Sequence, residues 1–254
     1  MRCSQGNLRL SFWWGTIGNQ VSGYQETLLI YAPTCINRQC SYYYVPQTPQ
    51  ATNCPKCKRQ LKKLLSTKVI DDVTFDQSLE TNYEAPILGI EVNDILAKEI
   101  INYHQQIKQS LRTIYGNPDN IPHQIATVFD CEPVYLTLHS LSHLLIKTVP
   151  LLFLASHQDL SSFTVERPVK WDNPHRTLVY IFDSVHEGCG TTEALVNDWD
   201  ACVQKALELA SNCDCGDLGC PRCLTEYGCP ESNEALSKLS GMWLLEQIAN
   251  GTFS

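Results

Sequence analysis

The sequence predicts an α+β protein, with an N-terminal β-rich module followed by a mainly helical domain with a short central sheet. Strand-like stretches fill the first 90 residues, and helical patterns dominate from residue 93 onward. Nine of the 13 cysteines fall in two clusters, at 35–57 and 213–229, one in each part. We therefore expect two domains, residues 1–90 and 91–254.

The N-terminal part is expected to consist of strands. Residues 8–32 mix aromatic and β-branched residues with glycines, which predicts two or three strands. Residues 66–90 predict extended chain and loops, and they are the best candidate for a linker between the domains.

The first helix of the C-terminal part is predicted over residues 93–116. Its apolar residues recur at helical spacing, Asn93 or Asp94 suits the N-cap, and Gly116 follows the end.

The remaining elements alternate between helix and strand. Residues 133–155 predict a largely buried helix that stops or kinks at Pro150. Residues 177–184 predict a short strand, and the following "HEGCG" is a turn that needs positive φ or a close backbone approach. Helices are then expected over 191–210, capped by one of its first two threonines, and over 233–249, capped by Ser232 or Asn233.

The spacing of the first cysteine cluster is typical of a zinc site. Two close pairs separated by 13 residues can place four thiolates tetrahedrally around one ion. We expect this site to be structural, because four sulfurs leave no position for water, and the β-rich module is therefore zinc-ribbon-like. The expected ligands are Cys35, Cys40, Cys54 and Cys57.

The second cluster offers five cysteines for four ligand positions. Cys220 and Cys223 form a clear knuckle, and we expect Cys215 and Cys229 to complete a second structural zinc site. Cys213 is the alternative ligand. Zinc would stabilise a short irregular segment between two helices, which has no core of its own.

The charge distribution points to one basic region. The net charge is −8, which argues against nonspecific nucleic-acid binding by the whole surface. Residues 54–68 nevertheless hold six basic residues and no acidic one. Their side chains are candidates for phosphate contacts. The candidate DNA-binding residues are Lys56, Lys58, Arg59, Lys62 and Lys63.

Two histidines allow a competing hypothesis. His139 and His143 are four residues apart on a predicted helix, so both imidazoles lie on one face. With Asp183 as a third ligand they could hold a catalytic metal, and the chain would then be a metal-dependent hydrolase or nuclease.

Residues 130–250 resemble the MrfA-like zinc-binding domain family. The shared pattern comprises C-x-C, a GCP-x-C knuckle, a further cysteine and an Asn–Leu–Lys helix opening. An apolar helix with a histidine and a strand ending in Asp before a glycine-rich turn precede it. Cys189 stands where the family often has a second glycine. The matching residues are His143, Asp183, Gly188, Gly190, Cys213, Cys215, Gly219, Cys220, Pro221, Cys223, Cys229, Asn233, Leu236 and Lys238.

The resemblance implies a role beside a DNA motor. Such domains are found at the C-terminal end of superfamily 2 repair helicases and in the helicase-partner subunit of the DISARM anti-phage system. This sequence has no G-x-x-x-x-G-K-[ST] nucleotide loop. We therefore expect a non-catalytic accessory subunit with two structural zinc ions, unless the chain is a fragment of a longer one. It would bind a superfamily 2 helicase, and DNA through the complex, in DNA repair or anti-phage defence.

The sequence favours a cytoplasmic protein without a membrane partner. The most apolar run, residues 144–155, contains Lys147 and Pro150, and the first 15 residues lack the layout of a secretory signal.

Overall fold

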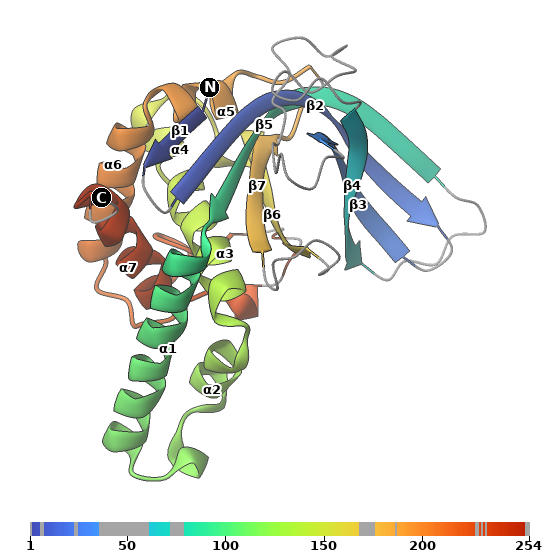
Figure 1. Cartoon of the computed structure of the whole chain (residues 1–254). Helices are drawn as coiled ribbons and strands as arrows, with labels where there is room; N and C mark the ends of the chain where they lie inside the picture. Colours follow the sequence, from blue (N-terminus) through green and yellow to red (C-terminus); the bar gives the residue numbers. More distant parts are fainter. Residues whose placement is uncertain are drawn as a thin grey trace.

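A computed structural model shows one curled antiparallel sheet with helices packed against it (Figure 1). The structure describes residues 2–5, 8–22, 25–35, 61–71, 79–167, 176–185, 187–226, 229, 231 and 233–251.

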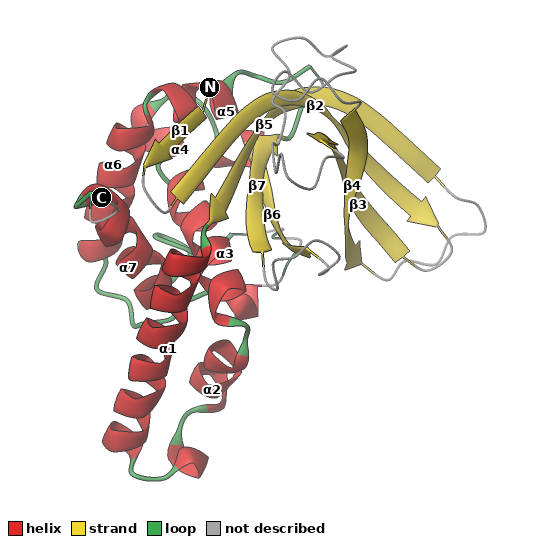
Figure 2. Cartoon of the chain, viewed as in Figure 1, coloured by secondary structure: helices red, strands yellow, loops and turns green. Residues whose placement is uncertain are grey.

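The described strands form a seven-stranded sheet in the order β4-β3-β2-β5-β7-β6, with β1 paired to β2. β4 contacts β6 although the two lie at opposite ends of this order, because the sheet curls (Figure 2). The strands are β1 (Arg2–Gln5), β2 (Leu8–Ser22), β3 (Gln25–Cys35), β4 (Leu61–Asp71), β5 (Leu79–Val92), β6 (Leu160–Arg167) and β7 (Arg176–Asp183).

β5 is the strand that joins the two parts of the sequence. It pairs with β2 on one side and with β7 on the other. Ala85, Ile87, Leu88 and Ile90 are completely buried, as expected for a strand covered on both faces. The expectation of a linker over residues 66–90 is therefore wrong, because the apolar run at its end belongs to the middle of the sheet.

The helices pack mainly on one face of the sheet. α3 contacts β6 and β7, and α7 and α6 lie against each other beyond it. The helices are α1 (Asp94–Tyr115), α2 (His123–Asp130), α3 (Pro133–Ile146), α4 (Val149–Leu152), α5 (Thr191–Asn197), α6 (Trp199–Ser211) and α7 (Lys238–Ala249), with single 3-10 turns at Pro118–Asn120, His157–Asp159 and Asn233–Ala235.

Alternate residues of the central strands point into two different hydrophobic cores, one on each face of the sheet. Leu88 and Ile90 pack with the leucines of α3 and α7 in the larger core, whereas Ile87 and Tyr180 belong to a second core on the opposite face. This alternation follows from the period of two in a strand. The α+β class predicted from the sequence is confirmed.

The ends of the first helices agree with the sequence. The Asn93 side chain accepts hydrogen bonds from the N–H groups of Ile95 and Leu96, and Gly116 ends α1 with φ 70°. α3 ends at Ile146, and Pro150 lies in the first turn of the separate helix α4. The caps of α1 are as predicted, and the predicted interruption near Pro150 is present, although the break lies at residues 147–148, just before it.

Two expected elements differ in detail, and one strand was not foreseen. The helix predicted over 191–210 is divided into α5 and α6 at Asp198, and Gly190 occupies the first N-cap. The last helix starts at Lys238 with Ser237 as its cap, not at Ser232 or Asn233. β6 was not expected, although its alternating "SFTVE" is a strand pattern.

Among the residues that the structure describes, no helix is both long and apolar enough to cross a bilayer.

Candidate metal centre

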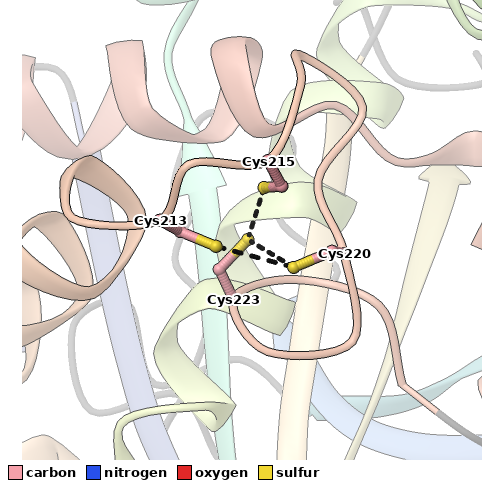
Figure 3. Close-up of side chains that lie close together, drawn as sticks. All are labelled: Cys213, Cys215, Cys220 and Cys223. Carbon is pink, nitrogen blue, oxygen red and sulfur yellow. Dashed lines mark hydrogen bonds between the residues drawn. The ribbon is translucent and has the colours of Figure 1, made fainter.

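Four cysteines of the second cluster converge just after α6. Cys213 and Cys215 lie in the loop that leaves the helix, and Cys220 and Cys223 lie on the two sides of a tight turn. The N–H groups of Cys223, Leu224 and Thr225 all donate to the Cys220 carbonyl oxygen, at 3.1, 2.8 and 3.0 Å. This knuckle points both of its sulfurs toward the other two (Figure 3).

The sulfur positions fit a zinc ion. The Sγ–Sγ distances are 3.5 Å for Cys213–Cys220, 3.4 Å for Cys215–Cys223 and 3.9 Å for Cys220–Cys223. A tetrahedral zinc with Zn–S bonds of about 2.3 Å requires sulfurs about 3.8 Å apart. All four sulfurs lie within 4.8 Å of one another, and none is in a disulfide. The set therefore matches a closed, structural zinc site.

Lys238 places a positive charge beside this group. Lys238 is only 8% exposed, and its ammonium group donates hydrogen bonds to the carbonyl oxygens of Cys213 and Cys215, at 3.0 and 2.9 Å. Four thiolates around one zinc ion carry a net charge of about −2, so a buried cation nearby offsets part of it. Sequence reasoning found Lys238 only as part of the family pattern and gave it no role.

The thiols differ in acidity. Burial raises the pKa of Cys223 and of Cys215. Burial acts in the same direction on Cys220, but the backbone N–H groups of Arg222 and Cys223 help to lower its pKa to about 7. Four crowded thiols cannot all ionise without a cation, and zinc supplies the charge that allows it.

Gly219 makes the turn that delivers Cys220 to the site. Its φ is +84°, and a Cβ there would lie 2.6 Å from Cδ2 of the buried Leu224. We expect Gly219→Ala to lower the free energy of unfolding by about 2–4 kcal/mol, from the left-handed backbone and the overpacking together. Urea denaturation measures this. Gly216→Ala is the matched control, because nothing lies within 4 Å of its Cβ, and equal losses in the two variants would contradict the argument.

The placement of Cys229 differs from the sequence expectation. The structure brings Cys215, Cys220 and Cys223 together with Cys213, the residue expected only as an alternative. Cys229 instead groups with His139 and His143. The physical reason lies in the neighbouring helices: Cys213 follows directly from the end of α6, whereas Sγ of Cys229 lies 3.3 Å from Nε2 of His139 on α3.

His139 and His143 are both buried on α3. Nδ1 of His139 lies 2.8 Å from the Ala235 carbonyl oxygen, and Nδ1 of His143 lies 3.0 Å from that of Leu224. Burial and the neighbouring His139 lower the pKa of His143 to about 4, so its imidazole is neutral at pH 7.

Asp183 does not join these histidines. Its Oδ2 accepts from the N–H groups of Cys189 and Gly190, both at 2.7 Å, and its Oδ1 accepts from the N–H and hydroxyl of Thr192. The carboxylate thus occupies the N-terminus of α5. A catalytic metal held by His139, His143 and Asp183 is not what this geometry supports.

The glycine-rich turn after Asp183 has the form expected from the sequence. Gly188 has φ +70°, and a Cβ there would lie 2.5 Å from Pro86 Cδ on β5. Both the positive φ and the close approach that "HEGCG" predicts are therefore confirmed.

The first cluster falls mostly outside the described residues. Cys35 ends β3 and pairs with Leu61 at the start of β4, so residues 36–60 connect two neighbouring strands. Lys62 and Lys63 lie in β4. The expected ligands Cys40, Cys54 and Cys57, and the basic residues Lys56, Lys58 and Arg59, lie outside the part that the structure describes.

Two known proteins are similar to this chain. The uncharacterized protein MJ1572.1 of Methanocaldococcus jannaschii is 28% identical over 111 residues, which cover 44% of this chain and 98% of that protein. A crystal structure of the DUF1998 helicase MrfA bound to DNA aligns with 96% of this chain at 15% identity and a TM-score of 0.40. This chain spans 25% of the helicase chain.

A family model matches the part that contains the four-cysteine group. The family is the MrfA Zn-binding domain, and the match covers residues 141–224. It includes Cys213, Cys215, Cys220 and Cys223 and ends before Cys229. The geometry of the four cysteines and the matched range thus agree, and residues 141–224 of this chain are similar to the MrfA Zn-binding domain family.

Proposed function

We propose that this chain is a non-catalytic, zinc-stabilised accessory subunit that binds a superfamily 2 DNA helicase or a nuclease partner. The MrfA Zn-binding domain at residues 141–224 is the observation that carries this proposal. The helicase MrfA, whose name the family bears, has been crystallised bound to DNA. DNA repair and anti-phage defence, including DISARM, are the processes in which such a subunit acts.

The arrangement of the fold supports the accessory role. The zinc site fixes the loop between α6 and α7, and these two helices pack together beyond α3. Most of the basic residues lie in the sequence that joins β3 to β4, or at the start of β4. This part of the chain is remote in sequence from the loop between α6 and α7. In this proposal zinc ions act as scaffold, one in the group of Cys213, Cys215, Cys220 and Cys223 and one in the group of Cys35, Cys40, Cys54 and Cys57.

Complex formation is the direct test. The full chain is co-expressed with superfamily 2 helicases encoded in the same genome, and the mass of the purified assembly is measured by light scattering. We expect a stable complex with one helicase and no ATP hydrolysis by the chain alone. ATP hydrolysis by the purified chain, or the absence of any complex, would contradict the proposal.

DNA binding by the complex should depend on the basic strip, defined as residues 54–68 with their six basic side chains. We expect the double variant Lys62→Glu, Lys63→Glu to weaken DNA binding about tenfold and to reduce its salt dependence, because each lost phosphate contact removes about 0.9 from the log–log slope. Fluorescence anisotropy across a salt series measures both. Lys98→Glu on α1 is the matched control, since Lys98 is exposed and lies in a different element. If the double variant bound DNA with unchanged affinity, Lys62 and Lys63 would not belong to the proposed DNA interface.

A further inference from the structure

A second group of metal-binding side chains lies outside the four-cysteine site. His139, His143 and Cys229 place one ligand atom each within 4.8 Å of the others. The His139 residue is completely buried and His143 is 4% exposed. Nε2 of His139 lies 3.3 Å from Sγ of Cys229, and the two imidazoles meet edge to face with centroids 4.7 Å apart.

The hydrogen bonds fix the tautomer of both histidines. The carbonyl oxygens of Ala235 and Leu224 can only accept, so Nδ1 of His139 and Nδ1 of His143 must carry the protons. In the neutral imidazoles the lone pairs are then on Nε2, and in His139 this is the atom that lies 3.3 Å from Sγ of Cys229. A histidine that donates its other N–H to a backbone carbonyl is the usual orientation of a metal ligand.

The Glu231 carboxylate and the Cys229 thiol also lie close to the imidazole of His139. The Glu231 side chain is completely buried, and its Oε2 lies 3.7 Å from Nε2 of His139. The carboxylate is held in place, since Oε1 accepts from the Tyr135 hydroxyl at 2.9 Å and Oε2 from the N–H of Thr164 at 2.8 Å. The N–H of Glu231 lies 3.4 Å from Sγ of Cys229, an orientation that stabilises a thiolate.

From this geometry we infer that the chain binds a further divalent metal ion, zinc, through Nε2 of His139, Nε2 of His143 and Sγ of Cys229, beside the buried Glu231 carboxylate. Imidazole, thiolate and carboxylate are the ligands that zinc accepts in tetrahedral sites. The negative charges of the Cys229 thiolate and the Glu231 carboxylate would balance the +2 charge of the ion. The ion would in turn compensate the free-energy cost of burying two anions.

The site would fasten one segment to the core of the fold. His139 and His143 come from α3, and Cys229 and Glu231 come from the chain between the zinc knuckle and α7. The same segment contacts α3 and its surroundings through Glu226, which pairs with Lys147 and His157 at 2.6 and 3.0 Å. The ion would therefore be structural, and it uses the cysteine left over from the neighbouring site.

Crystals of the full chain purified with zinc give the sharpest test. An anomalous difference map at the zinc edge should show a peak about 2.0–2.3 Å from both Nε2 atoms and from Sγ of Cys229, in addition to the peak among the four cysteines. A peak among the four cysteines with none beside His139 would overturn the inference. This measurement needs no variant and so does not depend on a variant folding.

Metal content of variants provides the second test. We expect His143→Ala and Cys229→Ser each to lose one zinc equivalent per chain relative to the wild type. The matched controls are His104→Ala and Cys131→Ser, which should lose none. His104 is also buried and bonds a carbonyl oxygen, that of Phe129, but it belongs to neither ligand group. Full zinc content in Cys229→Ser, with circular dichroism equal to that of the wild type, would exclude the site.

Cobalt substitution separates this site from the four-cysteine site. The thiolate-to-cobalt absorption of the wild type should contain a component with a single thiolate, which is absent in Cys229→Ser, while the four-thiolate component stays unchanged. Loss of both components in equal proportion would mean that Cys229 serves the four-cysteine group, and would overturn the inference. The result is independent of whether a helicase binds.

Discussion

Cys223→Ser is expected to release the zinc ion of the four-cysteine group and to lower the free energy of unfolding by about 5 kcal/mol or more. The Cys223 side chain is completely buried, and its sulfur approaches those of both Cys215 and Cys220. A serine oxygen cannot replace the thiolate as a ligand in this closed group. Metal binding to such sites is itself folding free energy.

Thermal unfolding with zinc analysis measures this effect. For a chain of this size, about 5 kcal/mol corresponds to a fall in Tm of about 10–20 °C. Cys202→Ser is the matched control, because Cys202 is equally buried on α6 but belongs to neither ligand group. Chelation of the wild type should destabilise it at least as much as Cys223→Ser. A variant that keeps its zinc and melts with the control would disprove the assignment of this ligand.

Asp183→Ala should be the most damaging change outside the metal sites, with a loss of about 3–5 kcal/mol in the free energy of unfolding. The carboxylate is completely buried and accepts four hydrogen bonds, three from backbone N–H groups and one from the Thr192 hydroxyl. Removing it leaves the N–H and hydroxyl of the buried Thr192 without an acceptor, which is costly, and it also breaks the bonds from the N–H groups of Cys189 and Gly190. The turn with Gly188 and the start of α5 should then lose their fixed geometry.

Urea denaturation of paired variants isolates this contribution. Asp159 also accepts from a backbone N–H, that of Ser156, but it is partly exposed and lies in a 3-10 turn. We expect Asp159→Ala to cost about 1 kcal/mol. If the two substitutions cost the same, the dense hydrogen bonding of Asp183 contributes little to stability.

Local signals in the sequence predicted most elements correctly. Asn93, Gly116 and Pro150 mark helix ends through backbone chemistry that needs no knowledge of the rest of the fold. The knuckle of Cys220 and Cys223 is similarly local, because two intervening residues fix its turn.

Long-range pairing explains what the sequence did not reveal. The sequence over 66–90 shows extended chain, but only the pairing of β5 with β7, about 90 residues further on, makes it the middle of a sheet. The choice between Cys213 and Cys229 depends in the same way on α3, which holds the histidines next to Cys229. Glu231 carried no signal at all, since its burial comes from contacts with Tyr135 and Thr164.

The double pairing of β5 has a practical meaning for anyone who dissects the protein. A truncation at residue 90 would cut through this strand just before its end and deprive β7 of a neighbour. Recombinant fragments should therefore keep residues 79–92 with the C-terminal portion. By the same logic, a force applied to the edge strand β4 would reach β5, and the helix α1 that follows it, through the hydrogen bonds between paired strands rather than through a flexible linker.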